Sequence, residues 1–200
     1  MTNSHPRTPQ NLNLPDAEII YYQSFYSSEI ADRYFQQLRD ETEWQQDDIK
    51  IFGKVYPQPR LTAFFGEPDK KYTYSGITMK PLPFTGLLKK IKTDVESISG
   101  IVFNSVLLNL YRDGMDSNGW HSDDEPALGK NPVIASLSLG AERQFQLRHK
   151  SVKTARTALT LEHGSLLLMK GETQHFWQHQ IPKTQKQVDT RINLTFRVLI

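Results

Sequence analysis

The chain has 200 residues, with 24 Lys or Arg, 22 Asp or Glu and a formal net charge of +2 at pH 7. Hydrophobic residues make up 38% of it and Cys is absent, so it has a globular composition that excludes disulfides, zinc–cysteine sites, iron–sulfur clusters and cysteine nucleophiles. Because the net charge is small, a nucleic-acid partner has to be argued from where the charges lie.

The N-terminal segment, residues 1–15, is polar and rich in Pro and Asn. It lacks the basic and then apolar layout of a signal peptide, and we expect a flexible arm. No run of about 18 apolar residues occurs, so we expect no membrane contact. Together with the absence of Cys, this favours the cytoplasm, or the nucleus if the chain is eukaryotic.

Two helices are predicted in the first half of the chain. Ser28 is the predicted N-cap of the first, and its apolar stripe is Ile30, Ala31, Tyr34, Phe35 and Leu38. The second covers residues 85–97 and ends at Gly100. Its inward residues are Leu87, Leu88, Ile91 and Val95.

After Gly100 the hydrophobic period shifts toward two, which predicts short strands bounded by turns. The predicted strands are residues 102–111, 133–139, 144–148, 157–161, 165–169 and 191–199. Helices followed by many short strands predict an α+β, mostly β fold, with a sandwich or barrel in the C-terminal two-thirds. No repeat or long linker occurs, and we expect one domain over residues 16–200.

A His-x-Asp motif follows a glycine-containing loop after residue 111. In extended chain, His121 and Asp123 point to the same side, which suits one face of an octahedral metal. With a second His they would form the two-His, one-carboxylate set of non-haem Fe(II) oxygenases. Taken alone, the motif is more often a surface hydrogen-bonded pair.

The C-terminal strand alternates strictly between apolar and polar residues. Its polar face carries Arg191, Asn193, Thr195 and Arg197. The plain interpretation is a half-buried strand with a solvated face. The two arginines also suit a small dicarboxylate lying between them, because guanidinium groups bind carboxylates with paired hydrogen bonds.

A third metal ligand has to come from a later histidine. His163 precedes a glycine and favours a turn role, and His149 lies between Arg148 and Lys150, where a cation is repelled. His175 and His179 remain, and spacing alone leaves both open, since both share a face if the stretch is extended.

Further motifs occur in the order in which a known family has them. They are Phe52-Gly53-Lys54, Pro59-Arg60, Tyr72-Thr73-Tyr74-Ser75-Gly76, Asn109-x-Tyr111, His121-x-Asp123-Asp124-Glu125, Arg148-His149-Lys150 and His163-Gly164-Ser165-Leu166-Leu167. With the closing Arg-x-Asn-x-Thr-x-Arg strand, they resemble the AlkB family of Fe(II)/2-oxoglutarate-dependent dioxygenases, especially the animal homologues that act on DNA. The resemblance covers residues 51–200. It implies a double-stranded β-helix (jelly roll) at residues 101–200, with helices and nucleotide-recognition hairpins at 16–100.

The resemblance also implies the cofactors and the reaction. Fe(II) is held by His121, Asp123 and His179, because His179-Gln-Ile-Pro resembles the motif of the family's distal histidine. The implied 2-oxoglutarate contacts are Asn109, Tyr111, Arg191, Asn193, Thr195 and Arg197, with one carboxylate at Arg191 and the other near Arg197. The implied activity is oxidative demethylation of N-alkylated bases in DNA, of the 1-methyladenine and 3-methylcytosine type. It releases formaldehyde and converts 2-oxoglutarate and O₂ to succinate and CO₂.

Residues that touch the DNA are implied in the same way. Tyr74 resembles the residue that stacks on the damaged base, and Phe52 the finger that fills the gap left by a flipped base. The implied substrate contacts are Phe52, Gly53, Lys54, Tyr72, Tyr74, Asp124 and Glu125. The implied phosphate contacts are Arg60, Arg148, Lys150 and Lys153. The last three lie in a basic segment, residues 143–156, which also contains Arg143 and Arg156. This segment is shorter than in the human relative that acts on double strands, so strand preference stays open.

Two alternatives stay open. One is the same iron and 2-oxoglutarate chemistry on RNA, a protein or a small metabolite. The other is a non-catalytic nucleic-acid-binding module whose His and Asp residues are structural. We expect the chain to be a monomer.

Overall fold

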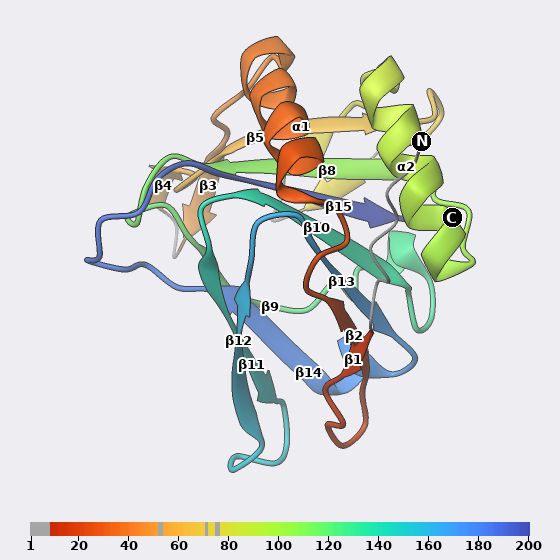
Figure 1. Cartoon of the computed structure of the whole chain (residues 1–200). Coiled ribbons are helices and arrows are strands. Elements are labelled where there is room, and N and C mark those ends of the chain that lie inside the picture. Colours follow the sequence, from red (N-terminus) through yellow and green to blue (C-terminus); the bar gives the residue numbers. More distant parts are fainter. Residues whose placement is uncertain (1–8, 52–53, 71, 75–76) are drawn as a thin grey trace.

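The strands form two facing sheets, and two helices cover the outer side of the larger one (Figure 1). The computed structural model describes residues 9–51, 54–70, 72–74 and 77–200. The larger sheet runs in the order β1 (Gln10–Asn11), β2 (Glu18–Tyr22), β13 (Ser165–Lys170), β10 (Ile134–Gly140), β15 (Arg191–Arg197), β8 (Ser105–Tyr111) and β5 (Leu61–Gly66). The smaller runs β12 (Arg156–Leu161), β11 (Arg143–His149), β14 (Trp177–Ile181) and β9 (Asn118–His121). Neighbouring strands pair antiparallel, which is the predicted jelly roll.

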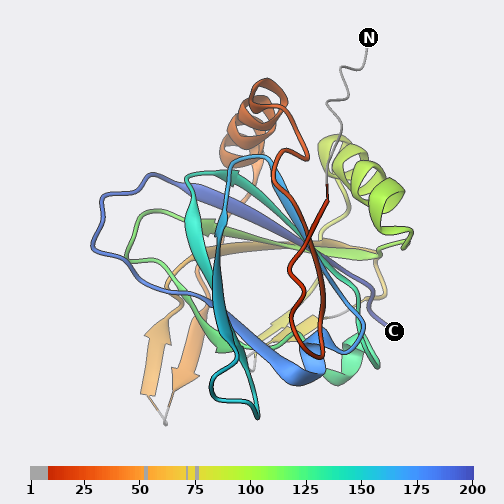
Figure 2. The ribbon, with the colours of Figure 1, turned by 60° about the horizontal axis from the view of Figure 1, so that its bottom comes forward.

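Two hairpins lie outside these sheets. One is formed by β3 (Asp48–Ile51) and β4 (Lys54–Pro57), and Figure 2 shows it standing clear of both sheets. The other is formed by β6 (Tyr72–Tyr74) and β7 (Ile77–Met79). Two short helical turns complete the chain, namely α3 (Thr173–Phe176) and the 3-10 turn Pro126–Leu128.

The two long helices are α1 (Ser28–Glu41) and α2 (Gly86–Ser99). The predicted cap of α1 is wrong by one residue: Ser27 has the extended backbone of an N-cap, and its side chain accepts from the Ile30 N–H. Thr85 caps α2, and Gly100 ends it with φ at +70°, a conformation that glycine adopts without strain. No helix in the described part of the chain is long and apolar enough to cross a membrane.

Alternation along the strands divides the core into two layers. On β15, Ile192, Leu194 and Phe196 pack toward the helices, together with Leu88 and Ile91 of α2. Between the sheets, a second cluster joins inward residues of the larger sheet to those of the smaller one, among them Leu107, Tyr111, Phe145, Leu147 and Trp177. Both faces of β15 are buried, so its polar residues face the other sheet and not solvent. The half-buried interpretation of this strand is therefore wrong.

All six predicted strands are present as β8, β10, β11, β12, β13 and β15, and the fold class is confirmed. The division of the chain at residues 15 and 100 stays a prediction. Residues 1–8 lie outside the described residues, whereas β1 pairs with β2, and the Pro15 carbonyl accepts from Trp177 Nε1. β2 and β5 also belong to the larger sheet, so the boundary at residue 100 crosses that sheet.

Candidate metal centre

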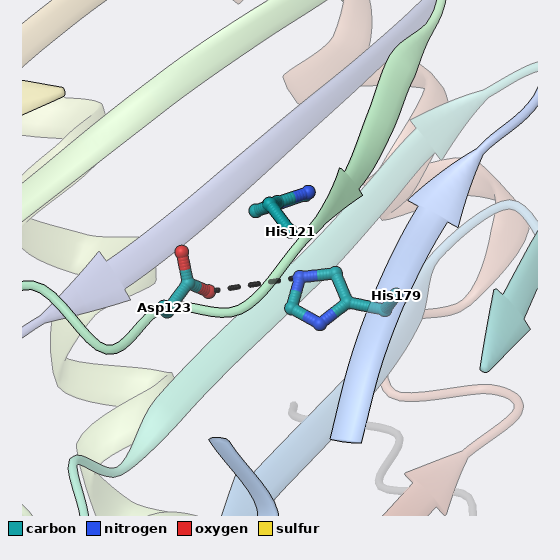
Figure 3. Close-up of side chains that lie close together, drawn as sticks. All are labelled: His121, Asp123 and His179. Atoms are coloured by element: carbon teal, nitrogen blue, oxygen red, sulfur yellow. Dashed lines mark ion pairs between the residues drawn. The ribbon is translucent and has the colours of Figure 1, made fainter. Parts of the chain in front are cut away.

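The structure brings His121, Asp123 and His179 together between the two sheets (Figure 3). His121 ends β9, Asp123 follows two residues later, and His179 lies opposite His121 on β14. One ligand atom from each of the three residues lies within 4.8 Å of the others. His179 Nε2 and Asp123 Oδ2 are 3.9 Å apart. Two imidazoles and a carboxylate at these distances suit a divalent iron ion.

Hydrogen bonds orient the first two of these side chains. His121 Nδ1 lies 2.7 Å from the Gly119 carbonyl, and because a carbonyl only accepts, Nδ1 carries the hydrogen and Nε2 keeps its lone pair. Asp123 Oδ1 accepts from Arg197 Nη2 at 2.8 Å. Such partners fix the tautomer and direction of metal ligands.

Burial and charge set the protonation of this cluster. Burial lowers the pKa of His121, and burial together with the neighbouring His121 lowers the pKa of His179 to about 3. Burial raises the pKa of Asp123, but Arg197 and the two histidines outweigh it and bring that pKa to about 2. At neutral pH the cluster therefore holds two neutral imidazoles and one carboxylate, the forms that bind metal.

The choice between His175 and His179 is decided by the short helix α3. Because α3 interrupts the extended chain, the two histidines do not share a face, and His175 is exposed beside Phe176. Only His179 joins His121 and Asp123.

The two other histidines considered as metal ligands, His149 and His163, stabilise turns by accepting hydrogen bonds from backbone N–H groups. His149 Nδ1 accepts from the backbone N–H groups of Ser151 and Val152. His163 Nδ1 accepts from the Gly140 N–H, which agrees with the predicted turn role.

A cavity beside the candidate metal centre contains the predicted 2-oxoglutarate wall. The three candidate metal ligands line this cavity. The six predicted contacts also line it: Asn109, Tyr111, Arg191, Asn193, Thr195 and Arg197. Four of them lie opposite one another across β8 and β15, with Arg191 opposite Tyr111 and Asn193 opposite Asn109.

Arg191 is a buried cation with unused hydrogen-bond donors. It is 1% exposed, and its Nη2 donates to Ser138 Oγ at 2.9 Å. Its Nε and Nη1 have no hydrogen-bond partner among the described residues. Burial lowers the pKa of Arg191 to about 10, so the group stays charged at pH 7. A carboxylate fits these donors, because a buried charge needs a partner of opposite sign.

The remainder of the wall is ordered by its own hydrogen bonds. Thr195 Oγ1 donates to Asn193 Oδ1 at 2.9 Å, and Asn193 Nδ2 donates to Ser136 Oγ at 2.7 Å. Arg197 reaches the metal centre through Asp123. The polar face of β15 therefore connects the buried cation at one end to the candidate metal at the other.

Arg60 disagrees with its predicted role as a phosphate contact. It is 4% exposed and lines the cavity. Its Nε donates to Asn109 Oδ1 at 2.8 Å, and its Nη1 donates to the Ser117 carbonyl at 3.0 Å. A guanidinium enclosed in this way has no surface to offer a phosphate from solvent, and Arg60 instead holds Asn109, a residue of the predicted 2-oxoglutarate wall.

The predicted substrate contacts are placed only in part. Phe52 and Gly53 lie outside the described residues, as do the side chains of Tyr72 and Tyr74. Lys54 is exposed on the β3–β4 hairpin, and Glu125 is half-buried two residues after Asp123. Asp124 is exposed, and its Oδ2 pairs with Lys150 Nζ at 3.0 Å, so a predicted base contact and a predicted phosphate contact bind each other.

The other basic residues of the segment differ in exposure. Arg148 lies over the ring of Trp120, with its carbon Cζ 4.2 Å from the ring centroid, and donates to Gln178 Oε1. Lys153 and Arg156 are exposed at the end of the β11–β12 hairpin. Arg143 is buried and donates to three backbone carbonyls, which gives it a structural role.

Sequence reasoning missed several residues of the cavity. Ser136 lines it, and Ser138 binds Arg191. The alternation of these serines with leucines on residues 134–140 is the signal that would have found them. Asn118 also lines the cavity, and Gln174 accepts a hydrogen bond from the Asp123 N–H, but neither residue carries a sequence signal of its own.

Known proteins similar to this chain are named as oxygenases, dioxygenases or demethylases. The profile of the 2OG-Fe(II) oxygenase superfamily matches residues 18–197. Alpha-ketoglutarate-dependent dioxygenase alkB homolog 3 of Homo sapiens is 43% identical over 192 residues, covering 92% of this chain and 66% of that protein. DNA oxidative demethylase ALKBH2 of Homo sapiens is 39% identical over 189 residues, covering 90% of this chain and 72% of that protein.

The chain is shorter than these relatives. It spans 64–66% of the length of the alkB homolog 3 proteins of human, cattle, rat and mouse. A solved structure described as "The structure of OsALKBH1" superposes with a TM-score of 0.67 and 16% identity, covering 96% of this chain and 100% of that one. That likeness shows the fold.

Proposed function

The chain belongs to the AlkB family of the 2OG-Fe(II) oxygenase superfamily, and from this premise we propose that it demethylates alkylated bases in DNA. The proposed substrates are bases of the 1-methyladenine and 3-methylcytosine type. The reaction would consume 2-oxoglutarate and O₂ and would release formaldehyde, succinate and CO₂. The name of the human relative ALKBH2, a DNA oxidative demethylase, supports the choice of DNA.

One observation carries the proposal. A two-His, one-carboxylate cluster and a buried arginine with unused donors lie in a single cavity. A structural cluster of His and Asp has no use for a buried arginine with unused donors in the same cavity, whereas an iron centre with a dicarboxylate cosubstrate uses both the cluster and the arginine. This argues against a non-catalytic module.

In the proposed site, His121, Asp123 and His179 would hold Fe(II). When bound with 2-oxoglutarate and O₂, the iron supplies the oxidant that attacks a methyl C–H bond. Arg191 would bind one carboxylate of 2-oxoglutarate, and its Nε and Nη1 are the free donors for it. The catalytic residues of the proposal are the three metal ligands.

The wall would orient the cosubstrate and keep water from the reacting atoms. Asn109, Tyr111, Asn193 and Thr195 would line its length, with the second carboxylate near Arg197. All four are buried, and Asn109, Asn193 and Thr195 are held by hydrogen bonds within the protein. A rigid, dry wall of this kind favours one orientation of the bound acid.

The substrate contacts remain part of the proposal. Tyr72 and Tyr74 would stack on the flipped base, Phe52 and Gly53 would fill the gap in the stack, and Asp124 and Glu125 would accept from an exocyclic amine. Lys54, Arg148 and Lys153 would contact phosphates, and the exposure of Lys54 and Lys153 supports this, whereas Arg148 is half-buried over Trp120. Lys150 would do so only after release from Asp124. A monomer in the cytoplasm or nucleus is proposed with this activity.

The test is mass spectrometry of an oligonucleotide that carries 1-methyladenine. The oligonucleotide, single-stranded or annealed, is incubated with the protein, Fe(II), 2-oxoglutarate and air. We expect loss of one methyl group that depends on 2-oxoglutarate and is absent in Asp123→Ala. The two arms also measure the strand preference.

Two other results would contradict the proposal in different ways. Succinate formation without methyl loss would keep the oxygenase and remove DNA as the substrate. Methylated RNA, a protein or a metabolite would then be tested in its place. Oligonucleotide binding with neither succinate formation nor methyl loss would favour a binding module.

A further inference from the structure

The loop between two candidate metal ligands is tied to the segment that leads to the third. Ser122 Oγ donates to the Trp177 carbonyl at 2.9 Å, and the Asp123 N–H donates to Gln174 Oε1 at 2.9 Å. Gln174 belongs to α3, and Trp177 begins β14, two residues before His179. Hydrogen bonds that do not involve the ligand side chains therefore join the segment of His121 and Asp123 to the segment that leads to His179.

The Gln174 side chain is enclosed and has a defined orientation. It is 1% exposed, and its Nε2 lies 3.4 Å from Met169 Sδ, a weak acceptor. A main-chain N–H only donates, so the amide oxygen has to face Asp123. If this oxygen were removed, the Asp123 N–H would lose its partner in a buried site.

A third tie holds the next residue of the loop. Lys150 Nζ lies 3.0 Å from Asp124 Oδ2 and 3.0 Å from the Gln174 carbonyl. Three consecutive residues, 122–124, are thus tied to α3 and β14, directly or through Lys150. The loop that carries Asp123 has few alternative conformations.

We propose that Gln174, supported by Ser122, is a positioning residue that holds the Asp123 carboxylate toward His179 before the metal binds. This inference rests on the proposed iron centre. A loop ordered in advance loses less conformational entropy when its carboxylate binds a cation. Removing hydrogen bonds behind metal ligands in proteins typically weakens metal binding by about 10–100-fold.

The test compares Gln174→Met with Thr173→Val in binding Co²⁺, a redox-stable substitute for Fe(II), by isothermal titration calorimetry. Both variants remove a buried side-chain acceptor of a backbone N–H from α3, but Thr173 accepts from Glu18 N–H and not from the metal loop. We expect Gln174→Met to raise the Kd for Co²⁺ about 10-fold or more, and Thr173→Val to leave it at the wild-type value.

The thermal midpoint of each metal-free variant is measured in parallel. If Gln174→Met does not fold, Ser122→Ala replaces it and should weaken Co²⁺ binding more than Thr173→Val does. Wild-type affinity in Gln174→Met, or an equal loss in Thr173→Val, would overturn the positioning role. Failure of the wild-type protein to bind Co²⁺ would instead count against the proposed iron centre.

Discussion

The guanidinium of Arg191 lies buried between Tyr111 and Ser138 and forms no ion pair with the described residues. Burying a cation without an anion costs free energy, which a bound carboxylate would recover. The group is therefore expected to reduce the stability of the ligand-free protein and to raise its affinity for an acid. Both effects can be measured separately.

Replacing Arg191 by Met should separate binding from stability. Loss of a charge-assisted hydrogen bond of about 1.5–3 kcal/mol should weaken 2-oxoglutarate binding by about 10–150-fold. The thermal midpoint without 2-oxoglutarate should stay equal or rise, because a buried charge is replaced by an apolar chain of similar length. Titration of 2-oxoglutarate in a succinate assay and thermal melts check this. An unchanged KM for 2-oxoglutarate would contradict it.

The metal cluster makes a second prediction for single residues. His179→Ala should abolish metal binding and demethylation, since it removes one of three ligands. His175→Ala, a change of the same type four residues earlier on the exposed side of α3, should leave both intact. Co²⁺ titration measures the difference. Retained Co²⁺ binding and activity in the His179 variant would show that His179 is not a required ligand.

Among the connecting elements, the loop between β8 and β9 leads from the proposed cosubstrate wall to His121. Asp116 is buried in this loop and accepts from the Arg112 N–H, Nε and Nη2, while its carbonyl accepts from Arg143. Gly114 packs so closely on the Thr184 carbonyl that a Cβ would lie 2.4 Å from it. Packing and one carboxylate therefore hold this loop in place.

Asp116→Asn should destabilise the protein by about 1–3 kcal/mol at pH 7. Burial raises the pKa of Asp116, but the hydrogen bonds from Arg112 outweigh it and leave that pKa below its usual value of 3.8. A lowered folded-state pKa stabilises the fold above the unfolded pKa of about 3.9, and the effect is lost as pH falls through the folded pKa. Urea unfolding at pH 7, 5 and 3 should show a difference that shrinks only at pH 3. An equal difference at all three values would exclude the ionised carboxylate as its cause.

For the molecule as a whole, the arrangement in two sheets determines where a ligand can bind. The helices cover one face of the larger sheet, and the cavity lies on its other face, against the smaller sheet. The candidate metal ligands come from the smaller sheet and its adjoining loop, and the proposed carboxylate-binding wall comes from the larger one. A metal with 2-oxoglutarate would therefore connect the two sheets and stabilise their packing.

Co²⁺ and 2-oxoglutarate together should raise the thermal midpoint. If the free ligand is at 100 times its Kd, binding to the folded state adds about 2.7 kcal/mol, which corresponds to about 5–11 °C for a chain of this size. Differential scanning fluorimetry measures the shift, and Asp123→Ala should abolish most of it. The same shift in that variant would place the binding elsewhere.

Local pattern determined much of the fold and part of the site. The period of the apolar residues predicted both long helices, six strands and the two faces of β15. Burial of one face of a helix or strand places apolar residues at regular intervals along the sequence, and this interval can be read locally. His121 and Asp123 also followed from local spacing. Identifying the family then depended on the order of the motifs, and the matching profile and the similar relatives confirm that family.

Tertiary structure decided what depends on distant partners. His179 joins the cluster because α3 turns His175 away and β14 pairs with β9. Arg60 reaches the cavity and Asn109 because it directly precedes β5, the edge strand that pairs with β8. Hydrogen bonds between segments far apart in the sequence leave no periodic pattern along the chain, so a sequence alone shows which side chains are available but not which partners they find.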